Sequence, residues 1–259
     1  RDDLTRTPAQ LDQWQAHFDP YSELALDPAS HFSFISDTLN EGDSLFFSIA
    51  LKNISQQTCD SVLVKYWITT QNNQIIPIKT KKTAPLEAGS STVDSLWVST
   101  FGLKGVNRFW AEYNTIDSLT GNYDQPEIHH FNNSLNKIFY ISPDRKNPFL
   151  DVTFDGMHIA DGELVSANPQ IIMQLSDENK FLELNDTSMF AIYLKYPGQN
   201  TEQRVYFDQM EWIPAQLPKN SCKVIFNPQF SQDGFYMLRV QAKDISDNLS
   251  GKNDFKITF

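Results

Sequence analysis

The side chains with the clearest capacity for chemistry are acidic residues in predicted turns of the C-terminal half. They are Asp155, Asp161, Asp177, Glu178, Asp244 and Asp247. Turns at one end of a β-sandwich can gather carboxylate and carbonyl oxygens into the shell of about six to eight oxygens that Ca²⁺ prefers. Asp155, Asp161, Asp177, Asp244 and Asp247 are therefore candidate calcium ligands. The sequence contains no contiguous calcium-loop motif, and aspartates also cap turns without a metal, so both interpretations stay open.

The cysteines and the paired histidines lack a recognisable catalytic or metal-binding motif. A cysteine nucleophile needs a histidine beside its thiolate, and nothing of that kind surrounds Cys59 or Cys222. They fall in different predicted domains, so we expect no disulfide between them. His129 and His130 are adjacent on an extended stretch and point to opposite faces, which places them poorly around one ion. We expect no catalytic residue in this chain and no cofactor other than calcium.

Aromatic side chains offer a third kind of chemistry, because exposed indole and phenol rings can stack on sugar faces. The candidates for such a carbohydrate platform are Trp67, Trp97, Trp110, Tyr113 and Trp212. Aromatic residues in alternating strands are more often part of the core. We therefore expect these five to be buried and keep glycan binding as the alternative.

Composition narrows the classes of partner. The chain has 259 residues, enough for two ordinary domains, and a formal net charge of −11. Nucleic-acid binding needs a basic surface, so we expect no nucleic-acid partner. No apolar run approaches the roughly 18 residues of a membrane span, so we expect no membrane insertion. The sequence starts at Arg1 without an initiator Met, and we expect it to be a segment of a larger protein.

The elements that must position these residues are β-strands. Residues 1–30 are predicted to be a linker with a short helix, because Thr7 and Pro8 resemble a helix start and Leu11, Trp14 and Phe18 share one helical face. From about residue 31 the hydrophobic period becomes two, as in Leu45, Phe47, Ile49 and Leu51. Residues 31–142 are predicted to form one immunoglobulin-like β-sandwich.

Residues 143–148 are predicted to be a stiff connector, because prolines flank four polar residues. Residues 149–259 contain about seven predicted strands, the number in an immunoglobulin-like domain. The stretch from Asp233 to Asn248 is predicted to be the closing strand, with Phe235, Met237 and Val240 among its apolar positions. The expected fold is all-β, with two tandem immunoglobulin-like β-sandwiches and a short N-terminal helix.

Three segments of the first predicted domain carry a family resemblance: Leu86-Glu-Ala-Gly89, Gly105-Val-Asn107 and Gln125-Pro-Glu-Ile-His-His-Phe-Asn-Asn133. With them the domain resembles the cell-adhesion-related (CARDB-type) immunoglobulin-like domains of bacterial surface proteins. In the last segment we expect Glu127, Asn132 and Asn133 to satisfy backbone groups of loops between the sheets.

Four segments of the second predicted domain carry another resemblance: Asn147–Gly162, Leu164–Pro169, Asp177–Lys180 and Asp233–Tyr236. They resemble the region that follows the peptidase domain in large gingipain-like cysteine peptidases of the Bacteroidota, including relatives of the sortase-like surface component of type IX secretion. Two departures are Ala160 and the Asp247-Asn248 turn, which lacks a preceding glycine. The resemblance implies an extracellular or outer-surface location and a non-catalytic role next to a catalytic or sorting domain.

A further resemblance concerns modification. Five Asp-Ser/Thr-apolar triplets, beginning at Asp37, Asp43, Asp60, Asp94 and Asp117, resemble the O-glycosylation acceptor of Bacteroidota envelope proteins. Asp-Ser before a strand is also an ordinary turn, so we expect only one or two of them to be modified, with Ser118 the first candidate.

These observations favour a non-catalytic spacer and protein-interaction module of a large secreted or cell-surface bacterial protein. The expected partners are neighbouring domains of the same polypeptide, other surface proteins or glycans. The alternative is an adhesion module that binds calcium or a glycan.

Overall fold

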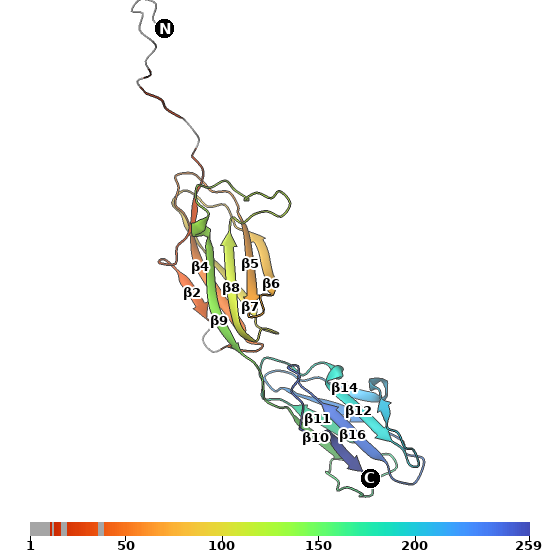
Figure 1. The fold of residues 1–259 in the computed structure, drawn as a ribbon. Coiled ribbons are helices and arrows are strands. Elements are labelled where there is room, and N and C mark those ends of the chain that lie inside the picture. The colour runs from red at the N-terminus through yellow and green to blue at the C-terminus, as the bar shows by residue number, and fades with distance from the viewer. Residues whose placement is uncertain (1–10, 12, 17–19, 36–38) are drawn as a thin grey trace, which may run out of the picture.

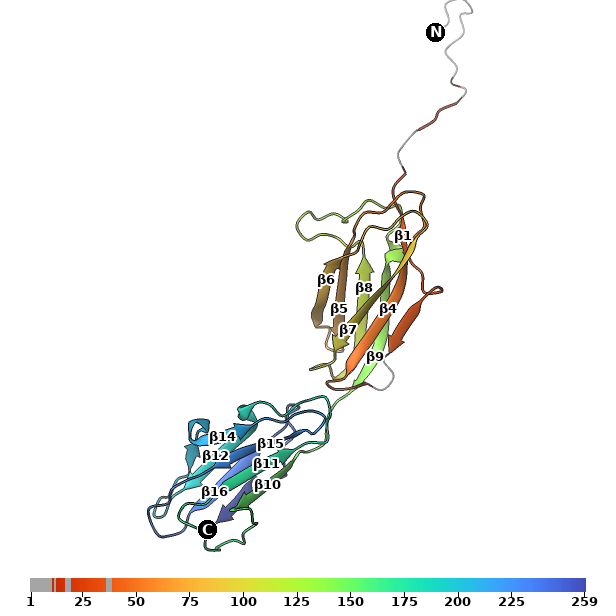
Figure 2. The ribbon, with the colours of Figure 1, turned by 180° about the vertical axis from the view of Figure 1, so that it is seen from behind.

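A computed structural model describes residues 11, 13–16, 20–35 and 39–259. The protein is all-β and consists of two β-sandwiches that follow one another along an elongated molecule (Figures 1 and 2). The first strand, β1 (Leu24–Leu26), lies near the outer end of the first sandwich (Figure 2), and the C-terminus lies on the second sandwich, away from the first (Figure 1). No helix among these residues is long and apolar enough to cross a membrane.

The first sandwich packs a four-stranded sheet against a five-stranded sheet. The first sheet contains β1 (Leu24–Leu26), β4 (Ser44–Asn53), β2 (Phe32–Ile35) and β7 (Ser91–Ser99). The second has the order β3 (Leu39–Asn40), β9 (Ser134–Ser142), β8 (Gly105–Tyr113), β5 (Leu63–Thr70) and β6 (Ile75–Lys82), with the short 3₁₀ helix η1 (Phe131–Asn133) before β9.

The second sandwich has two four-stranded sheets. One has the order β10 (Phe149–Phe154), β11 (Ile171–Ser176), β15 (Ser221–Phe226) and β14 (Met210–Ile213). The other has the order β13 (Gln203–Val205), β12 (Phe190–Lys195), β16 (Met237–Ala242) and β17 (Phe255–Thr258). The 3₁₀ helices η2 (Thr187–Met189) and η3 (Phe207–Gln209) precede β12 and β14.

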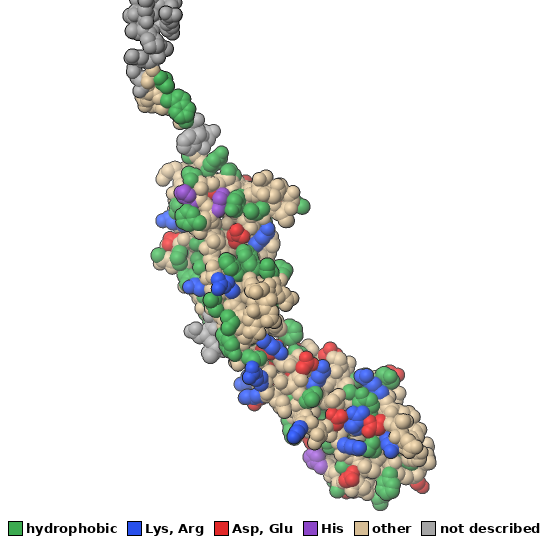
Figure 3. Space-filling view, viewed as in Figure 1, with side chains coloured by type: hydrophobic (Ala, Val, Ile, Leu, Met, Phe, Trp, Pro, Cys, Tyr) green, Lys and Arg blue, Asp and Glu red, His purple; other side chains and the backbone are tan. Residues whose placement is uncertain are grey.

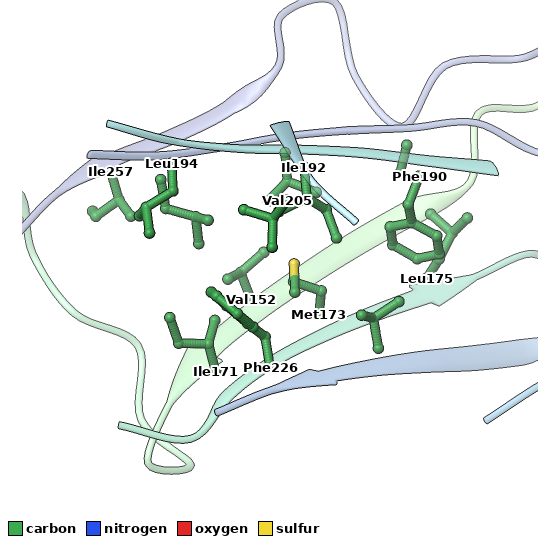
Figure 4. Close-up of a cluster of buried hydrophobic side chains, with 14 of the residues drawn as sticks. Val152, Ile171, Met173, Leu175, Phe190, Ile192, Leu194, Val205, Phe226 and Ile257 are labelled. Atoms are coloured by element: carbon green, nitrogen blue, oxygen red, sulfur yellow. The ribbon is translucent and has the colours of Figure 1, made fainter. Parts of the chain in front are cut away.

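Each sandwich has its own hydrophobic core. In the first, the alternating residues Leu45, Phe47, Ile49 and Leu51 of β4 are all buried, as the period of two predicts. In the second, side chains of the two sheets meet between the layers (Figure 4): Val152, Ile171, Met173, Leu175 and Phe226 come from one sheet, and Phe190, Ile192, Leu194, Val205 and Ile257 from the other. The two cores share no residue, so each domain buries enough apolar surface to be a separate cooperative unit.

Two expectations about the N-terminal segment were wrong. Residues 11 and 13–16 are not helical, and Leu11 and Trp14 are 78% and 79% exposed; the remainder of the predicted helix lies outside the described residues. A short helix in water is marginal unless an apolar face packs on something, and these side chains have no such contact. The predicted linker 1–30 also contains β1, whose Leu24 is buried and which pairs with β4.

The strand predicted near the C-terminus exists, but its buried face and place in the sheet differ from the prediction. Tyr236, Leu238, Val240 and Ala242 are buried, whereas Phe235 is 74% exposed. A shift of one residue in phase exchanges the two faces of a strand. β16 is moreover an inner strand between β12 and β17, and β17 lies at the edge.

Candidate functional site at the domain junction

Strand direction decides which of the candidate aspartates can meet. β10 leaves the connector and runs away from the first domain, so Asp155, which follows it, lies at the far end. β11 is antiparallel to β10 and returns, which places Asp177 at the near end. β16 also ends at the near end, followed by Asp244. A six-residue strand spans about 20 Å, so Asp155 and Asp177 belong to opposite ends of the sandwich.

Three carboxylates converge at the near end, next to the first domain. One oxygen each of Asp144, Asp177 and Asp244 lies within 4.8 Å of the other two. Asp144 comes from the connector, Asp177 from the end of β11 and Asp244 from the loop after β16. Asp244 is only 3% exposed. We call these residues the junction triad.

Neighbouring amides hold the junction triad in place. The Asn179 side-chain amide donates to Asp144 Oδ2 at 2.6 Å, and the Asn179 backbone N–H donates to Asp177 Oδ1 at 2.9 Å. The backbone and side chain of Asn248 donate to Asp244 Oδ1 and Oδ2, each at 2.8 Å. Asp177 Oδ2 is buried and has no hydrogen-bond partner within the described residues.

The electrostatics of the triad oppose full ionisation. Burial raises the pKa of Asp177, and the charges of Asp144 and Asp244 raise it further against the Asn179 hydrogen bond. Burial also raises the pKa of Asp244, with an added contribution from Asp144 and an opposing one from Asn248. Like charges in a poorly solvated place disfavour one another, so the triad favours a bound proton or a bound cation.

The other predicted calcium ligands have different roles. Asp155 Oδ1 accepts a hydrogen bond from the Gln170 backbone at 2.8 Å, and Asp161 Oδ1 accepts one from the Thr258 backbone at 2.7 Å. Both therefore fasten loops at the far end. Asp247 follows Asp244 in the chain, but its carboxylate pairs with Lys243 Nζ at 2.6 Å and is 76% exposed. Glu178 turns outward and pairs with Lys146.

Sequence reasoning missed Asp144, which was assigned only to a stiff connector. A usable signal was present: connector residues directly before β10 must lie at the same end as the residues directly after β11, because the strands are antiparallel.

The connector and both domains are hydrogen-bonded to one another at this junction. Glu41 is 3% exposed, and its Oε2 accepts from the Asp144 backbone at 3.3 Å and from Ser246 Oγ at 3.2 Å. Lys104 Nζ lies 3.4 Å from Glu41 Oε1. Asn248 Nδ2 donates to the Asp144 carbonyl at 3.2 Å. First domain, connector and second domain thus share one polar network.

A solvent-open groove of about 480 Å³ runs along this junction. Its lining mixes acidic Glu41, Asp144 and Glu178 with basic Arg145 and Lys146. The visible face in Figure 3 shows Lys and Arg side chains where the two domains meet. The mixed signs favour a small ion or a polar segment over a strongly charged polymer.

Both cysteines are buried and free. Burial raises the pKa of Cys222 to about 12, and burial is also the main reason that the pKa of Cys59 is raised. Since the thiolate is the nucleophile, neither thiol is suited to covalent catalysis.

We therefore expect an alkylating reagent such as iodoacetamide, at about pH 8, to leave both thiols of the folded chain unmodified for hours and to label both rapidly in denaturant. Intact-mass spectrometry reads the result directly. Rapid labelling of Cys222 in the folded chain would show that the thiol is accessible and reactive.

Glu127 and His130 lie in a cluster of hydrogen bonds and stacked rings. Glu127 accepts hydrogen bonds from the Leu24 backbone at 2.8 Å, from Asn114 Nδ2 at 2.7 Å and from Asn133 Nδ2. His130 stacks on Tyr123, with ring centroids 3.5 Å apart. The expectation that Glu127, Asn132 and Asn133 satisfy loop backbone groups was wrong in detail. The one backbone partner of Glu127 among the described residues is Leu24 of β1, and its other partners are two asparagine amides. Asn132 Oδ1 and Asn133 Oδ1 are buried and have no hydrogen-bond partner among the described residues.

The aromatic candidates do not gather on one surface. Tyr113 is fully buried, and Trp212 packs on the second core. Trp67 and Trp110 are half-buried and stack on the outer face of β5 and β8, with centroids 5.6 Å apart. Trp97, expected in the core, is 67% exposed because Leu96 and Val98 hold the inward positions of β7. Figure 3 accordingly shows apolar side chains scattered over the first domain.

The Asp-Ser/Thr triplets differ in what their aspartates do. Asp94 accepts hydrogen bonds from the buried Tyr66 and Tyr113 and pairs with Lys81, so this aspartate belongs to the packing between the sheets, although Ser95 itself is exposed. Ser118 lies in an exposed turn whose Asp117 accepts from the Leu119 backbone at 2.8 Å. The first two residues of the Asp37 triplet lie outside the described residues. Modification of Ser118 stays a prediction.

Comparisons with known proteins give a weak likeness in shape. No protein-family model matches the chain, and no curated protein matches it in sequence. A CARDB domain from Pyrococcus furiosus, solved in complex with di-metal ions, is 13% identical with a TM-score of 0.37, and the match covers 49% of this chain and 100% of that domain.

Two larger proteins are also similar in shape to this chain. A β-glucosidase from Listeria innocua is 14% identical with a TM-score of 0.33, over 55% of this chain and 20% of the enzyme. The red sea bream transglutaminase is 10% identical with a TM-score of 0.31, over 90% of this chain and 31% of the enzyme. The chain thus spans less than a third of either enzyme.

Proposed function

We propose that this chain is a non-catalytic spacer and protein-contact module of a large secreted or cell-surface bacterial protein. Within that class, the sequence segments quoted above favour a gingipain-like cysteine peptidase of the type IX secretion pathway, with the module next to its catalytic or sorting domain. Neighbouring domains and other surface proteins are the proposed partners.

The polar network at the junction is the observation that carries this proposal. Two domains joined by a flexible linker would adopt many orientations, whereas here Glu41 contacts both the connector and Ser246 of the second domain. Gly42 also packs closely on the second domain: a Cβ added there would lie 2.6 Å from Leu182 Cδ2 and 2.9 Å from Phe181 Cβ. A held orientation is what a spacer needs in order to present its neighbours at a defined angle.

The Gly42→Ala variant tests this contact. Its new methyl group would push Leu182 and Phe181 away, so we expect the relative orientation of the domains to become broader. Spin labels on cysteines introduced at the exposed positions Thr92 and Glu211 report the distance distribution between the domains. The native cysteines are buried and should not interfere. A narrow distribution is expected for the parent and a wider one for Gly42→Ala.

The Gly89→Ala variant is the matched control. Gly89 has a similarly positive φ of 71°, compared with 90° for Gly42, but nothing lies within 4 Å of its added Cβ. It carries the same kind of backbone strain without the contact between domains, so its distribution should equal that of the parent. A broad distribution in the parent itself would contradict the proposed role in rigid presentation.

A further inference from the structure

We propose that Asp144, Asp177 and Asp244 bind one calcium ion between the connector and the second domain. This inference goes beyond the spacer role, because it assigns a ligand to the junction. Its geometric basis is the convergence of three carboxylates, one oxygen of each within 4.8 Å of the others, from three separate segments of the chain. Ca²⁺–oxygen distances are about 2.3–2.6 Å, so these oxygen separations are of the order needed for the three carboxylates to share one cation.

The second and independent basis is an oxygen without a partner. Asp177 Oδ2 is buried, and no donor among the described residues reaches it. The other oxygen of the same carboxylate accepts from the Asn179 backbone, which holds the group in place. Buried polar atoms are nearly always satisfied in folded proteins. An unsatisfied oxygen on a carboxylate that lies next to two further carboxylates therefore favours a bound cation.

The charges around the triad support the same assignment. Within the described part of the chain, none of the three carboxylates forms an ion pair with Lys, Arg or His. Three basic side chains nearby pair with other acids: Lys243 with Asp247, Lys146 with Glu178 and Lys104 with Glu41. Arg145 and Lys180 line the groove but form no ion pair with the triad within the described residues. Three carboxylates this close together, with Asp244 buried and the other two partly buried, repel one another, and an ion of two positive charges offsets that repulsion.

The kind of ligand follows from the donor atoms. The triad offers oxygen only, which suits Ca²⁺ and Mg²⁺ rather than metals that prefer nitrogen or sulfur. Each triad oxygen that already accepts an N–H keeps a second lone pair for the ion. Hydrogen bonds from the Asn179 and Asn248 side-chain amides fix the orientations of the Asp144 and Asp244 carboxylates. The loops, and not an ideal coordination polyhedron, therefore set the arrangement of the oxygen ligands. Ca²⁺ accepts such an irregular shell, whereas Mg²⁺ demands near-octahedral geometry.

Water and ions can reach the site from the junction groove. Asp144 and Asn179 line that groove, which is open to solvent. Three carboxylates fill part of a Ca²⁺ shell, and waters from the groove can complete it. Binding would then tie the connector to the ends of β11 and β16.

Isothermal titration calorimetry of the metal-free chain with CaCl₂ tests the proposal. We expect a stoichiometry of one and a higher unfolding midpoint for the second domain in calcium than in chelator, because a ligand that binds only the folded state stabilises it. The Asp177→Asn variant removes one charge and should weaken calcium binding at least about tenfold. The Asp247→Asn variant changes an acid of the same loop as Asp244, but one that pairs with Lys243 and is exposed, and it should bind like the parent.

Folding of the variant is checked in chelator. Asp177→Asn relieves repulsion with Asp144 and Asp244, so its midpoint in chelator should be at least that of the parent. Absence of binding at about 10 mM CaCl₂ would overturn the proposal, as would binding that Asp177→Asn retains. Equal affinity for MgCl₂ would overturn the assignment to calcium. Because the spin-label distances are measured separately, either result leaves the test of the spacer role intact.

Discussion

Replacing Phe109 by alanine is expected to lower the free energy of unfolding of the first domain by about 3–5 kcal/mol and to leave the second domain unchanged. Phe109 is fully buried on β8, and its ring lies 4.8 Å from that of Phe47 and 5.8 Å from that of Phe34, between centroids. Its removal leaves a cavity that close-packed neighbours fill only in part. The two cores share no residue, so calorimetry should show two unfolding transitions, of which one shifts.

Val106→Ala is the control for this prediction. Val106 lies on the same strand but is 50% exposed, so its truncation should change the free energy by about 0.5 kcal/mol or less. The reciprocal variant, Phe190→Ala, should shift only the other transition, because Phe190 belongs to the second core. If calorimetry showed a single unfolding transition that shifted in both Phe109→Ala and Phe190→Ala, the two domains would unfold as one unit. That result would contradict the separation of their cores.

Glu127→Ala is expected to lower the free energy of unfolding of the first domain by about 3 kcal/mol or more, because it leaves several buried hydrogen-bond donors without an acceptor. The Glu127 side chain has no exposed surface and accepts from the Leu24 backbone, Asn114 and Asn133. It thereby attaches β1 to the loops before β9, together with the buried Glu23, which accepts from the Ile128 backbone at 2.9 Å. Chemical denaturation of parent and variant gives the difference.

The Glu127 carboxyl also predicts that the stability of the first domain depends on pH. Burial raises the pKa of Glu127, and the nearby Glu23 adds to this, whereas its hydrogen bonds oppose the shift. The folded chain therefore holds this proton more tightly than the unfolded chain does. Its contribution to stability is complete below about pH 4.3, the pKa of an unperturbed Glu, and is lost as the pH rises through the folded-state pKa.

The variant Glu127→Gln removes this titration. The stability of the parent relative to Glu127→Gln should therefore increase as the pH falls from neutral towards about 4.3. His130 Nδ1 lies 3.6 Å from Glu127, and a protonated ring would oppose the effect. The comparison is accordingly repeated in a His130→Gln background. A difference in stability that does not vary with pH would contradict the raised pKa.

Local sequence pattern was sufficient to predict the strands and much of the core. The alternation at Val62, Val64, Tyr66 and Ile68 reports burial directly, because successive side chains of a strand point to opposite faces, and all four are buried. The same rule cannot tell which face of a strand is buried where two consecutive residues are both apolar, as at Phe235 and Tyr236. There, packing against the opposite sheet selected the buried face.

The candidate site was predictable only in part. Asp177 and Asp244 were correctly placed in turns, but Asp155, Asp161 and Asp247 have the same local signal and lie elsewhere or pair with other groups. Asp144 was recognised only as a connector residue.

The sequence by itself therefore determined the fold class and the strands, because burial in a strand depends on residues two apart in the chain. The tertiary structure decided which carboxylates meet. Strand direction and the path of the connector bring residues 144, 177 and 244 to one end of the second sandwich, beside the first domain. That proximity depends on contacts between residues distant in the chain, which no local pattern records.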